Sequence, residues 1–187
     1  MKKNFYKNHL ELFKKLIHIE AKTEKKLDLT VKTLFSLKKK GKKIIICGNG
    51  GSAAIASHIA IDLLKNLKIQ SLPLTDASLI TCFSNDFKHK NWMKKAIEHY
   101  YSSGDIVVII SSSGMSSNIV NAAKFCVKKK IKLISFSGMK YRNKLNLINK
   151  KGIYFWINSM KYNHIELAHL YLLLLIVDKA IFQKKKN

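Results

Sequence analysis

An isoleucine-rich run at residues 43–47 is followed by a glycine-rich segment, Gly48-Asn49-Gly50-Gly51-Ser52, and then by a stretch with helical periodicity. Glycine allows the backbone to turn sharply, so that its N–H groups can approach a ligand closely. The start of a helix adds unpaired N–H donors and a partial positive charge, which suits a phosphate or a carboxylate. The segment therefore predicts an anion-binding loop. The alternative is a tight turn with Ser52 near the helix cap.

A second segment of small residues follows the strand-like run Ile106–Ile110, again at the start of a helical stretch. It reads Ser111-Ser112-Ser113-Gly114-Met115-Ser116-Ser117-Asn118 and holds five serines in eight positions. Hydroxyl and N–H groups that converge at a helix start can hold a phosphate without a cationic side chain, although serine is also common in an ordinary helix cap. Because the two segments occupy equivalent places in one sheet, we expect them to converge on a single phosphate.

Two nucleotide motifs compete for the first segment. A Walker A loop requires a lysine before the Ser or Thr, and Gly51-Ser52-Ala53 lacks it. The dinucleotide pattern G-x-G-x-x-A is formally met by Gly48, Gly50 and Ala53, with Asp76 at roughly the place of a ribose-binding acid. The serine-rich segment has no use in a dinucleotide fold, so we expect no nucleotide cofactor.

These loops need a parallel sheet to hold them side by side. Strand candidates at residues 43–47, 69–74, 106–110, 132–136 and 153–157 alternate with helical stretches. This alternation predicts an α/β fold with a doubly wound, mostly parallel five-stranded sheet. Residues 4–40 show the periodicity of two amphipathic helices, which we expect to form an N-terminal helical hairpin, and residues 164–182 that of a final buried helix.

Length and composition indicate one soluble domain. The chain has 187 residues, is 47% hydrophobic and contains a single proline. Its longest apolar run, Leu170–Val177, is far shorter than the roughly 20 residues of a membrane span, and the basic N-terminus lacks the apolar core of a signal peptide. Three cysteines without metal or redox spacing suit a reducing compartment. We therefore expect a cytoplasmic protein with no membrane partner.

The charge is strongly positive, with 35 Lys and Arg against 11 Asp and Glu and a formal net charge of +24. A basic surface can indicate a nucleic-acid partner. However, Arg142 is the only arginine, and arginine is the preferred residue for bidentate recognition of phosphate and guanine. Aromatic residues are also not interleaved with the basic ones as in a stacking platform. We therefore expect a solvated lysine surface and no nucleic-acid partner.

The sequence resembles the SIS (sugar isomerase) domain family and, within it, the phosphoheptose isomerases, which convert sedoheptulose 7-phosphate to a heptose 7-phosphate. The resemblance rests on CGNGGSAA at residues 47–54, SNDF at residues 84–87, GDIVVIISSSGMSSNIVNAA at residues 104–123 and IELAH at residues 165–169. It implies a single SIS domain over residues 1–187, with oligomerisation helices in residues 1–41 and a phosphosugar-binding core in residues 42–183. It also implies a homotetramer with active sites at subunit interfaces.

The resemblance assigns the sugar-binding residues. The phosphate would be held by the two loops and the sugar hydroxyls by an amide and a carboxylate. The implied residues are Asn49, Gly50, Gly51, Ser52, Asp86, Ser111, Ser112, Ser113 and Ser116.

The resemblance also implies an acid–base or metal cluster. His58 matches a histidine ligand of the family, Asp62 lies where the family has a glutamate base, and Glu166 lies where it has a glutamine ligand. His58 and Asp62 share a helical face at i and i+4, and with Glu166 they offer nitrogen and oxygen ligands for zinc. They could equally be partly exposed surface groups. Asp62 would be the base that moves a proton between C1 and C2.

The chain departs from the family pattern at two positions. The base is shortened from glutamate to Asp62, and the family's catalytic histidine on the last helix is replaced by Leu174. His164 or His169 could supply a substitute acid, and His169 could instead be a structural hydrogen-bond partner. Two interpretations follow: an isomerase of a phosphorylated sugar, and a non-catalytic SIS protein that acts as a sugar-phosphate sensor or as a scaffold associating with a replication initiator.

Overall fold

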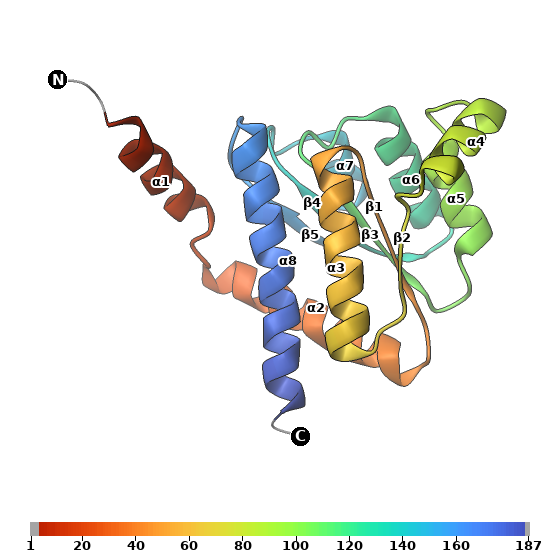
Figure 1. Ribbon diagram of the computed structural model, residues 1–187, viewed down its shortest axis with the longest axis horizontal. Coiled ribbons are helices and arrows are strands. Elements are labelled where there is room, and N and C mark those ends of the chain that lie inside the picture. Colours follow the sequence, from red (N-terminus) through yellow and green to blue (C-terminus); the bar gives the residue numbers. More distant parts are fainter. Residues whose placement is uncertain (1–3, 186–187) are drawn as a thin grey trace.

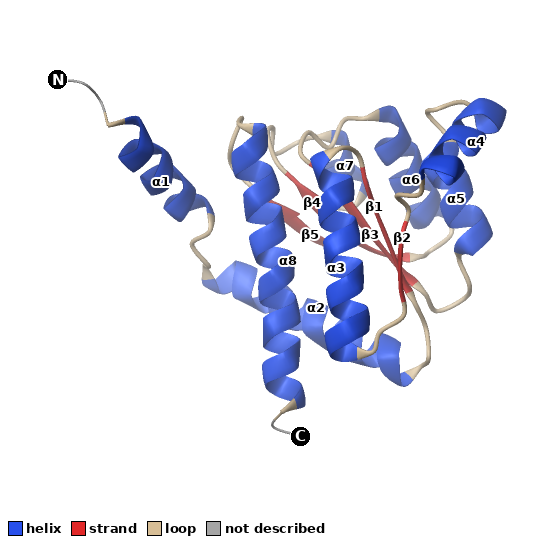
Figure 2. Cartoon of the chain, in the orientation of Figure 1, coloured by secondary structure: helices blue, strands red, loops and turns tan. Residues whose placement is uncertain are grey.

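A computed structural model describes residues 4–185 as one parallel sheet between two layers of helices (Figures 1 and 2). The strands are β1 (Ile44–Gly48), β2 (Ser71–Pro73), β3 (Ile106–Ser111), β4 (Lys132–Ser137) and β5 (Ile153–Trp156). The helices are α1 (Phe5–Leu16), α2 (Ala21–Lys39), α3 (Gly51–Leu67), α4 (Ala77–Phe87), α5 (Trp92–Tyr100), α6 (Ser117–Lys128), α7 (Lys144–Ile148) and α8 (Tyr162–Lys184). The predicted α/β class is confirmed.

The sheet has the strand order β2-β1-β3-β4-β5, and every pair of neighbours is parallel. The order reverses between β1 and β3, which makes this pair the topological switch point where ligands bind in open α/β sheets. Gly48 pairs with Ile110 at the carboxyl end of the two strands. The glycine-rich and serine-rich loops therefore leave adjacent strands at the same edge of the sheet.

The central strands form because both faces of the sheet are covered. β1 and β3 are buried along their whole length, and β-branched residues such as Ile45 and Val108 suit a pleated, fully buried surface. Alternate side chains contribute to two cores. One core includes Ile44, Ile46 and Val108 with α2, α3 and α8, and the other includes Ile45 and Val107 with α5, α6 and α7.

The two N-terminal helices form as predicted, but α1 does not fold back along α2 as a hairpin. It lies beside the start of α8, at the edge of the molecule (Figure 1). The contact between α1 and α8 is formed by aromatic rings. His9 Nε2 lies 3.0 Å from His164 Nε2, and the ring of Phe13 also contacts that of His164. None of the side chains of α1 is buried, because its apolar face extends beyond the core of this one chain.

Two further elements bear on the sequence predictions. Helices α4 and α5 occupy the region between β2 and β3, for which the sequence pattern predicted no helix. The last helix, α8, spans 23 residues. Within residues 4–185, none of the helices combines the length and the apolar character needed to cross a bilayer.

Candidate functional site

The two small-residue loops are joined by a reciprocal pair of amide hydrogen bonds. Asn49, in the loop after β1, donates from Nδ2 to Oδ1 of Asn118 at 3.1 Å, and Asn118 donates from Nδ2 to Oδ1 of Asn49 at 2.8 Å. Asn118 lies in the first turn of α6 and is buried. The pair fixes the distance between the starts of α3 and α6, so both helix N-termini face the same edge of the sheet. Asn118 belongs to the serine-rich motif, but the sequence gave it no role.

The first loop has a backbone that requires glycine. Gly50 has φ +53° and precedes the first residue of α3, a conformation that L-residues with side chains rarely adopt. A Cβ on Gly48 would lie 2.7 Å from the backbone of Ser52. The strand end and the helix start therefore approach as closely as two backbones can. Ser52 is buried beneath this turn, and the first N–H groups of α3 have no partner within the helix.

The serine hydroxyls of the second loop have different roles. Ser111 Oγ accepts a hydrogen bond from the N–H of Gly114 at 3.1 Å, and Ser113 Oγ accepts one from Met115 at 3.2 Å. Within residues 4–185, neither hydroxyl donates a hydrogen bond; Ser111 is buried, whereas Ser113 is partly exposed. Ser112 Oγ is buried and has no partner among residues 4–185. Ser116 is the N-cap of α6 but makes no capping bond with its side chain, so its hydroxyl is also available.

Among the described residues, Asp86 makes no hydrogen bond to either of the two loops. It is exposed near the end of α4, where its carboxylate accepts hydrogen bonds from Cys82 at 3.7 Å and Asn85 at 3.0 Å. Its contacts are thus local to one helix, and its expected role toward a sugar hydroxyl stays a prediction.

The candidate acid–base pair lies on α3. His58 Nε2 is 3.3 Å from Asp62 Oδ2, and the side chains are 53% and 24% exposed. The i, i+4 spacing predicted this neighbourhood. An imidazole beside a partly buried carboxylate can pass protons between the carboxylate and a bound hydroxyl group.

Glu166, the third predicted metal ligand, belongs to α8, and its carboxylate lies beside Gly51, the first residue of α3. A Cβ added to Gly51 would collide with its carboxylate, so the carboxylate sits at the helix start, where the dipole is positive. Together with Ile55 and Leu170 it lines a cavity of about 320 Å³ between α3 and α8. Glu166 therefore borders the glycine-rich loop, whereas His58 and Asp62 lie two to three turns further along the helix.

The three residues do not form a zinc site within one chain. Across residues 4–185, no group of three His, Cys, Asp or Glu side chains is close enough to hold a metal ion. Leu174, at the position of the family's catalytic histidine, is a partly buried side chain that packs against the apolar core. Within one chain, the described residues therefore do not bring the three expected zinc ligands together, and no step of the proposed chemistry passes through a metal.

His169 was expected as a substitute acid, but its position is that of a structural residue. It is fully buried between α8 and the sheet, where its Nε2–H donates to the carbonyl of Ser137 at 3.0 Å. Burial lowers the pKa of His169 to about 4, against a smaller opposing effect of this hydrogen bond. Such an imidazole stays neutral at pH 7 and has no access to a ligand. The catalytic assignment of His169 is therefore not supported by its geometry.

The buried imidazole should make folding sensitive to acid. Unfolded, His169 binds a proton below its ordinary pKa of 6.5, whereas the folded protein binds it only below about 4. Between these values the unfolded chain binds more protons, so the free energy of unfolding should fall as the pH drops from 6.5 toward 4. Urea titrations across this range should show a steeper fall for the wild type than for His169→Gln. Equal slopes would show that this histidine does not titrate on unfolding.

Comparison with known proteins identifies the family. Residues 5–138 match the SIS domain. The chain is 35% identical to the phosphoheptose isomerase of Campylobacter concisus over 144 residues, which cover 74% of this chain and 76% of that protein. It is 31% identical to the phosphoheptose isomerase of Thermodesulfovibrio yellowstonii, with coverage of 98% and 87%.

Solved structures show the same fold. A phosphoheptose isomerase from Francisella tularensis superposes with a TM-score of 0.82 at 24% identity, over 98% of this chain and 99% of that one. The phosphoheptose isomerase of Neisseria gonorrhoeae gives a TM-score of 0.77 at 24% identity, over 83% and 85%. The chain belongs to the SIS-domain family and, within it, to the phosphoheptose isomerases.

Proposed function

We propose that the protein is an aldose–ketose isomerase that interconverts sedoheptulose 7-phosphate and an aldoheptose 7-phosphate. The observation that carries this proposal is the amide pair between Asn49 and Asn118, which holds two phosphate-type loops together at the switch point of the sheet. Two relatives, which are more than 30% identical to this chain over most of their own length, are named phosphoheptose isomerase.

The two loops would bind the phosphate through backbone N–H groups and through serine hydroxyls that donate no hydrogen bond within the loops. The N–H groups at the start of α3 and α6 and the hydroxyls of Ser113 and Ser116 lie around one edge of the sheet. Hydrogen bonds to an ionised phosphate are about twice as strong as neutral ones. A phosphate fixed there would leave the rest of the sugar to extend over the start of α3, which Glu166 also borders.

Asp62 would act as the base, and because it lies about three turns along α3 from the phosphate loops of its own chain, it would serve a site shared with a neighbouring subunit. From the ketose, its carboxylate would take a proton from C1 while O2 gains a proton, which gives a cis-enediol. O1 would then lose its proton to form the aldehyde, and Asp62 would return a proton to C2. His58, 3.3 Å from Asp62, would exchange the hydroxyl protons with solvent, for which its half-exposed ring is suited. The sum is a shift of two hydrogens with no redox partner.

Turnover tests this proposal directly. The pure protein should convert sedoheptulose 7-phosphate to an aldoheptose phosphate, which proton NMR resolves from the ketose. In D₂O, deuterium should appear at the carbon that receives the proton, because the base exchanges with solvent. Parallel reactions with zinc and with a chelator should show whether added metal changes the rate. Substrate binding without turnover in both reactions would contradict the enzyme assignment.

One observation favours a second candidate function. Leu174 replaces the family's histidine, and His169 is too buried to replace it in turn. A chain without an acid would still bind a sugar phosphate and could act as a sensor or scaffold through contacts with other proteins. Binding with a normal affinity and no deuterium incorporation is the result expected of this candidate.

The amide bridge provides a prediction on binding. Replacing Asn118 with aspartate keeps the shape of the side chain but removes its donor and places a carboxylate beside the phosphate loops. We expect the affinity for sedoheptulose 7-phosphate to fall by about tenfold or more, because a charge-assisted site loses a donor and gains a repulsive group. Titration calorimetry measures this loss. Asn8→Asp makes the same charge change on exposed α1 and should bind normally.

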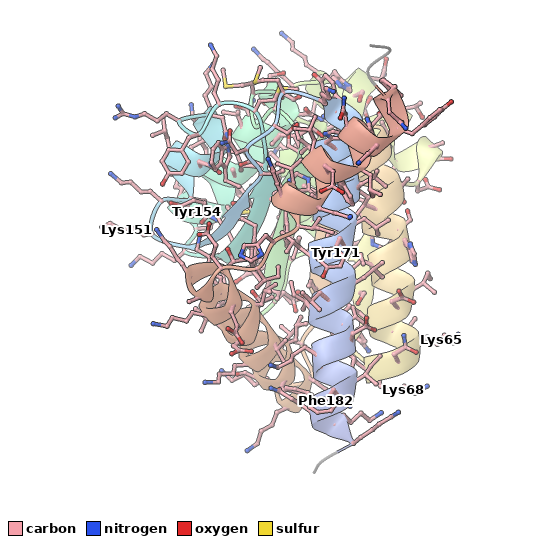
Figure 3. The ribbon with its side chains drawn as sticks, turned by 90° about the vertical axis from the view of Figure 1, so that its left-hand side faces the viewer. Lys65, Lys68, Lys151, Tyr154, Tyr171 and Phe182 are labelled. Carbon is pink, nitrogen blue, oxygen red and sulfur yellow. The ribbon has the colours of Figure 1, made fainter. Side chains whose placement is uncertain are left out.

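We also propose that the protein assembles as a homotetramer in the cytoplasm. Exposed apolar side chains lie on α1, α3 and α8, among them Leu10, Ile61, Leu167 and Tyr171, with exposures of 52%, 60%, 49% and 37%; Tyr171 is labelled in Figure 3. The largest apolar patches on soluble proteins often mark interfaces. Light scattering at micromolar concentration should give four times the chain mass; a monomer would contradict the assembly.

The proposed cytoplasmic location agrees with the cysteines. Cys47, Cys82 and Cys126 are free thiols, which suits a reducing compartment.

A further inference from the structure

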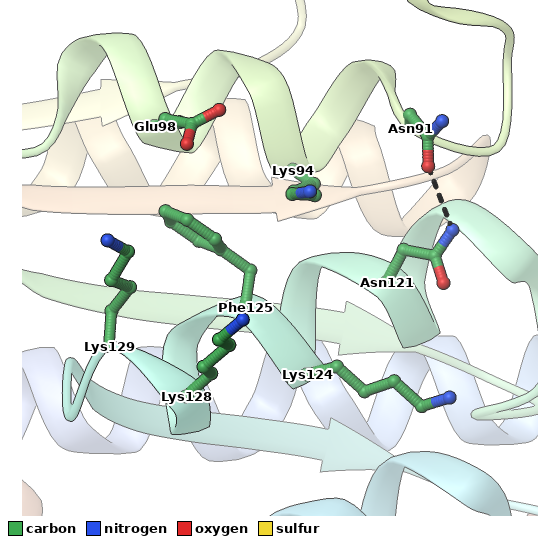
Figure 4. A pocket seen from close by; sticks show the side chains of 8 residues that line it. All are labelled: Asn91, Lys94, Glu98, Asn121, Lys124, Phe125, Lys128 and Lys129. Atoms are coloured by element: carbon green, nitrogen blue, oxygen red, sulfur yellow. Dashed lines mark hydrogen bonds between the residues drawn. The ribbon is translucent and has the colours of Figure 1, made fainter.

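A basic groove lies between α5 and α6, on the face of the sheet opposite α3 and α8 (Figures 1 and 4). Its volume is about 490 Å³, which is in the range of small-molecule sites. The lining residues are Asn91, Lys94, Glu98, Asn121, Lys124, Phe125, Lys128 and Lys129. None of them takes part in the chemistry proposed above.

The charges of this groove are unbalanced. The lining contains four lysines and one carboxylate, that of Glu98. Glu98 already accepts a hydrogen bond from Lys95 at 2.8 Å, and this bond holds the pKa of Glu98 below its ordinary value. Among residues 4–185, Lys94, Lys124, Lys128 and Lys129 form no ion pair. Like charges held together in a concave space repel one another unless an anion lies between them.

The framework of the groove is rigid at one end and along its floor. Asn121 Nδ2 donates to Oδ1 of Asn91 at 3.1 Å and to the carbonyl of Lys90 at 2.9 Å, which ties α6 to the start of α5. Phe125 is buried to 8% exposure and has the ammonium of Lys94 6.0 Å from its ring centre. Figure 4 shows Phe125 and Lys129 extending toward α5, where Glu98 and Lys94 lie. The lysines therefore project from fixed helices.

We propose that this groove binds a small metabolite that carries two or more linked phosphate groups. Lysine binds phosphate as a point charge through up to three donors, without the planar fork with which arginine reads a base or a single phosphate. Four lysines spread along two helices suit several phosphate groups in a row, more than the single phosphate of a heptose. The site is separate from the loops after β1 and β3, although α6 contributes to both through its opposite ends.

Titration of the full-length protein with inorganic tripolyphosphate at physiological salt tests this site. One ion should bind per chain. The double variant Lys94→Gln and Lys128→Gln should weaken binding by about tenfold or more, since each lysine provides a charge-assisted contact. The matched control is Lys65→Gln with Lys68→Gln, which removes the same charge at the far end of α3 (Figure 3) and should change the affinity less than about twofold.

Three results would overturn the proposal. Equal losses in both double variants would mean that only the net charge attracts the ion. Displacement of tripolyphosphate by saturating sedoheptulose 7-phosphate would place it in the loops of the proposed isomerase site. Tighter binding of duplex DNA, lost in the Lys94 and Lys128 variant, would make the groove a nucleic-acid surface. Arms with ATP and with inorganic pyrophosphate would distinguish a nucleotide from an inorganic source of the linked phosphates; neither arm depends on isomerase activity.

Discussion

Replacing Asp62 with asparagine should lower kcat for the isomerisation of sedoheptulose 7-phosphate by about 10²- to 10⁴-fold, the usual contribution of a general base. The asparagine amide keeps the size of the side chain and can still contact His58, which lies 3.3 Å from the present carboxylate. It cannot accept a proton from carbon. KM should change little, because binding depends on the phosphate loops. Steady-state kinetics followed by NMR measure both constants.

The matched control is Asp178→Asn, which removes one carboxylate from an exposed position of α8. It should retain the wild-type kcat. Deuterium incorporation from D₂O should be lost in Asp62→Asn and preserved in the control. Unchanged turnover in Asp62→Asn would move the base to another residue, and the pair on α3 would then be an ordinary surface interaction.

Replacing Gly48 with alanine should abolish sugar-phosphate binding and destabilise the fold. The new Cβ would lie 2.7 Å from backbone atoms of Ser52, and backbone atoms cannot move aside without opening the turn between β1 and α3. Forcing an extra group into such a packed place costs about 1–3 kcal/mol. Because the N–H groups of this turn point at the expected phosphate, affinity should fall with stability. Calorimetry with the sugar phosphate and urea unfolding measure the two effects.

Gly41→Ala separates these two effects. Gly41 also has a positive φ, of +62°, but a Cβ there meets nothing within 4 Å. Its strain costs about 1–2 kcal/mol, at a turn remote from the loops. The Gly41→Ala variant should therefore be less stable than the wild type but bind the sugar phosphate with the same affinity. Loss of affinity in both variants would show that binding follows global stability rather than the geometry of the first loop.

The sheet and the two loops could be predicted because their signals are local. Runs such as Ile106–Ile110 are β-branched and bounded by small residues, and a helix must follow each strand for a parallel sheet to form. The switch point then follows from connectivity, which places the loops at Cys47 and at Ile110 side by side. The strand predicted at residues 69–74 is shorter in the structure and spans only Ser71–Pro73. A proline and a position at the edge of the sheet limit its pairing.

The acid–base residues were harder to predict because their roles depend on long-range packing. A histidine one turn from Glu166 could face a ligand or the core, and only the packing of α8 against the sheet shows that His169 faces Ser137. The separation of Glu166 from His58 likewise depends on how α8 lies along α3, which no sequence spacing reveals. The amide pair between Asn49 and Asn118 joins residues 69 positions apart and has no local signal.

The position of α1 depends on what covers its apolar face. Periodicity predicted the helix, but periodicity gives no direction for its packing. In this single chain it contacts α8 through His9 and Phe13, and its exposed Leu10 and Leu12 are the side chains that the proposed assembly would bury. The helix was therefore predictable and its placement was not.

A crystal structure of the protein with sedoheptulose 7-phosphate is the most direct measurement. We expect the oxygens of one phosphate to lie within about 2.7–3.2 Å of donors from both the glycine-rich turn after β1 and the serine-rich turn after β3. C1 and C2 should lie near Asp62. A phosphate bound to only one turn, or bound elsewhere while both turns hold only water, would contradict the account.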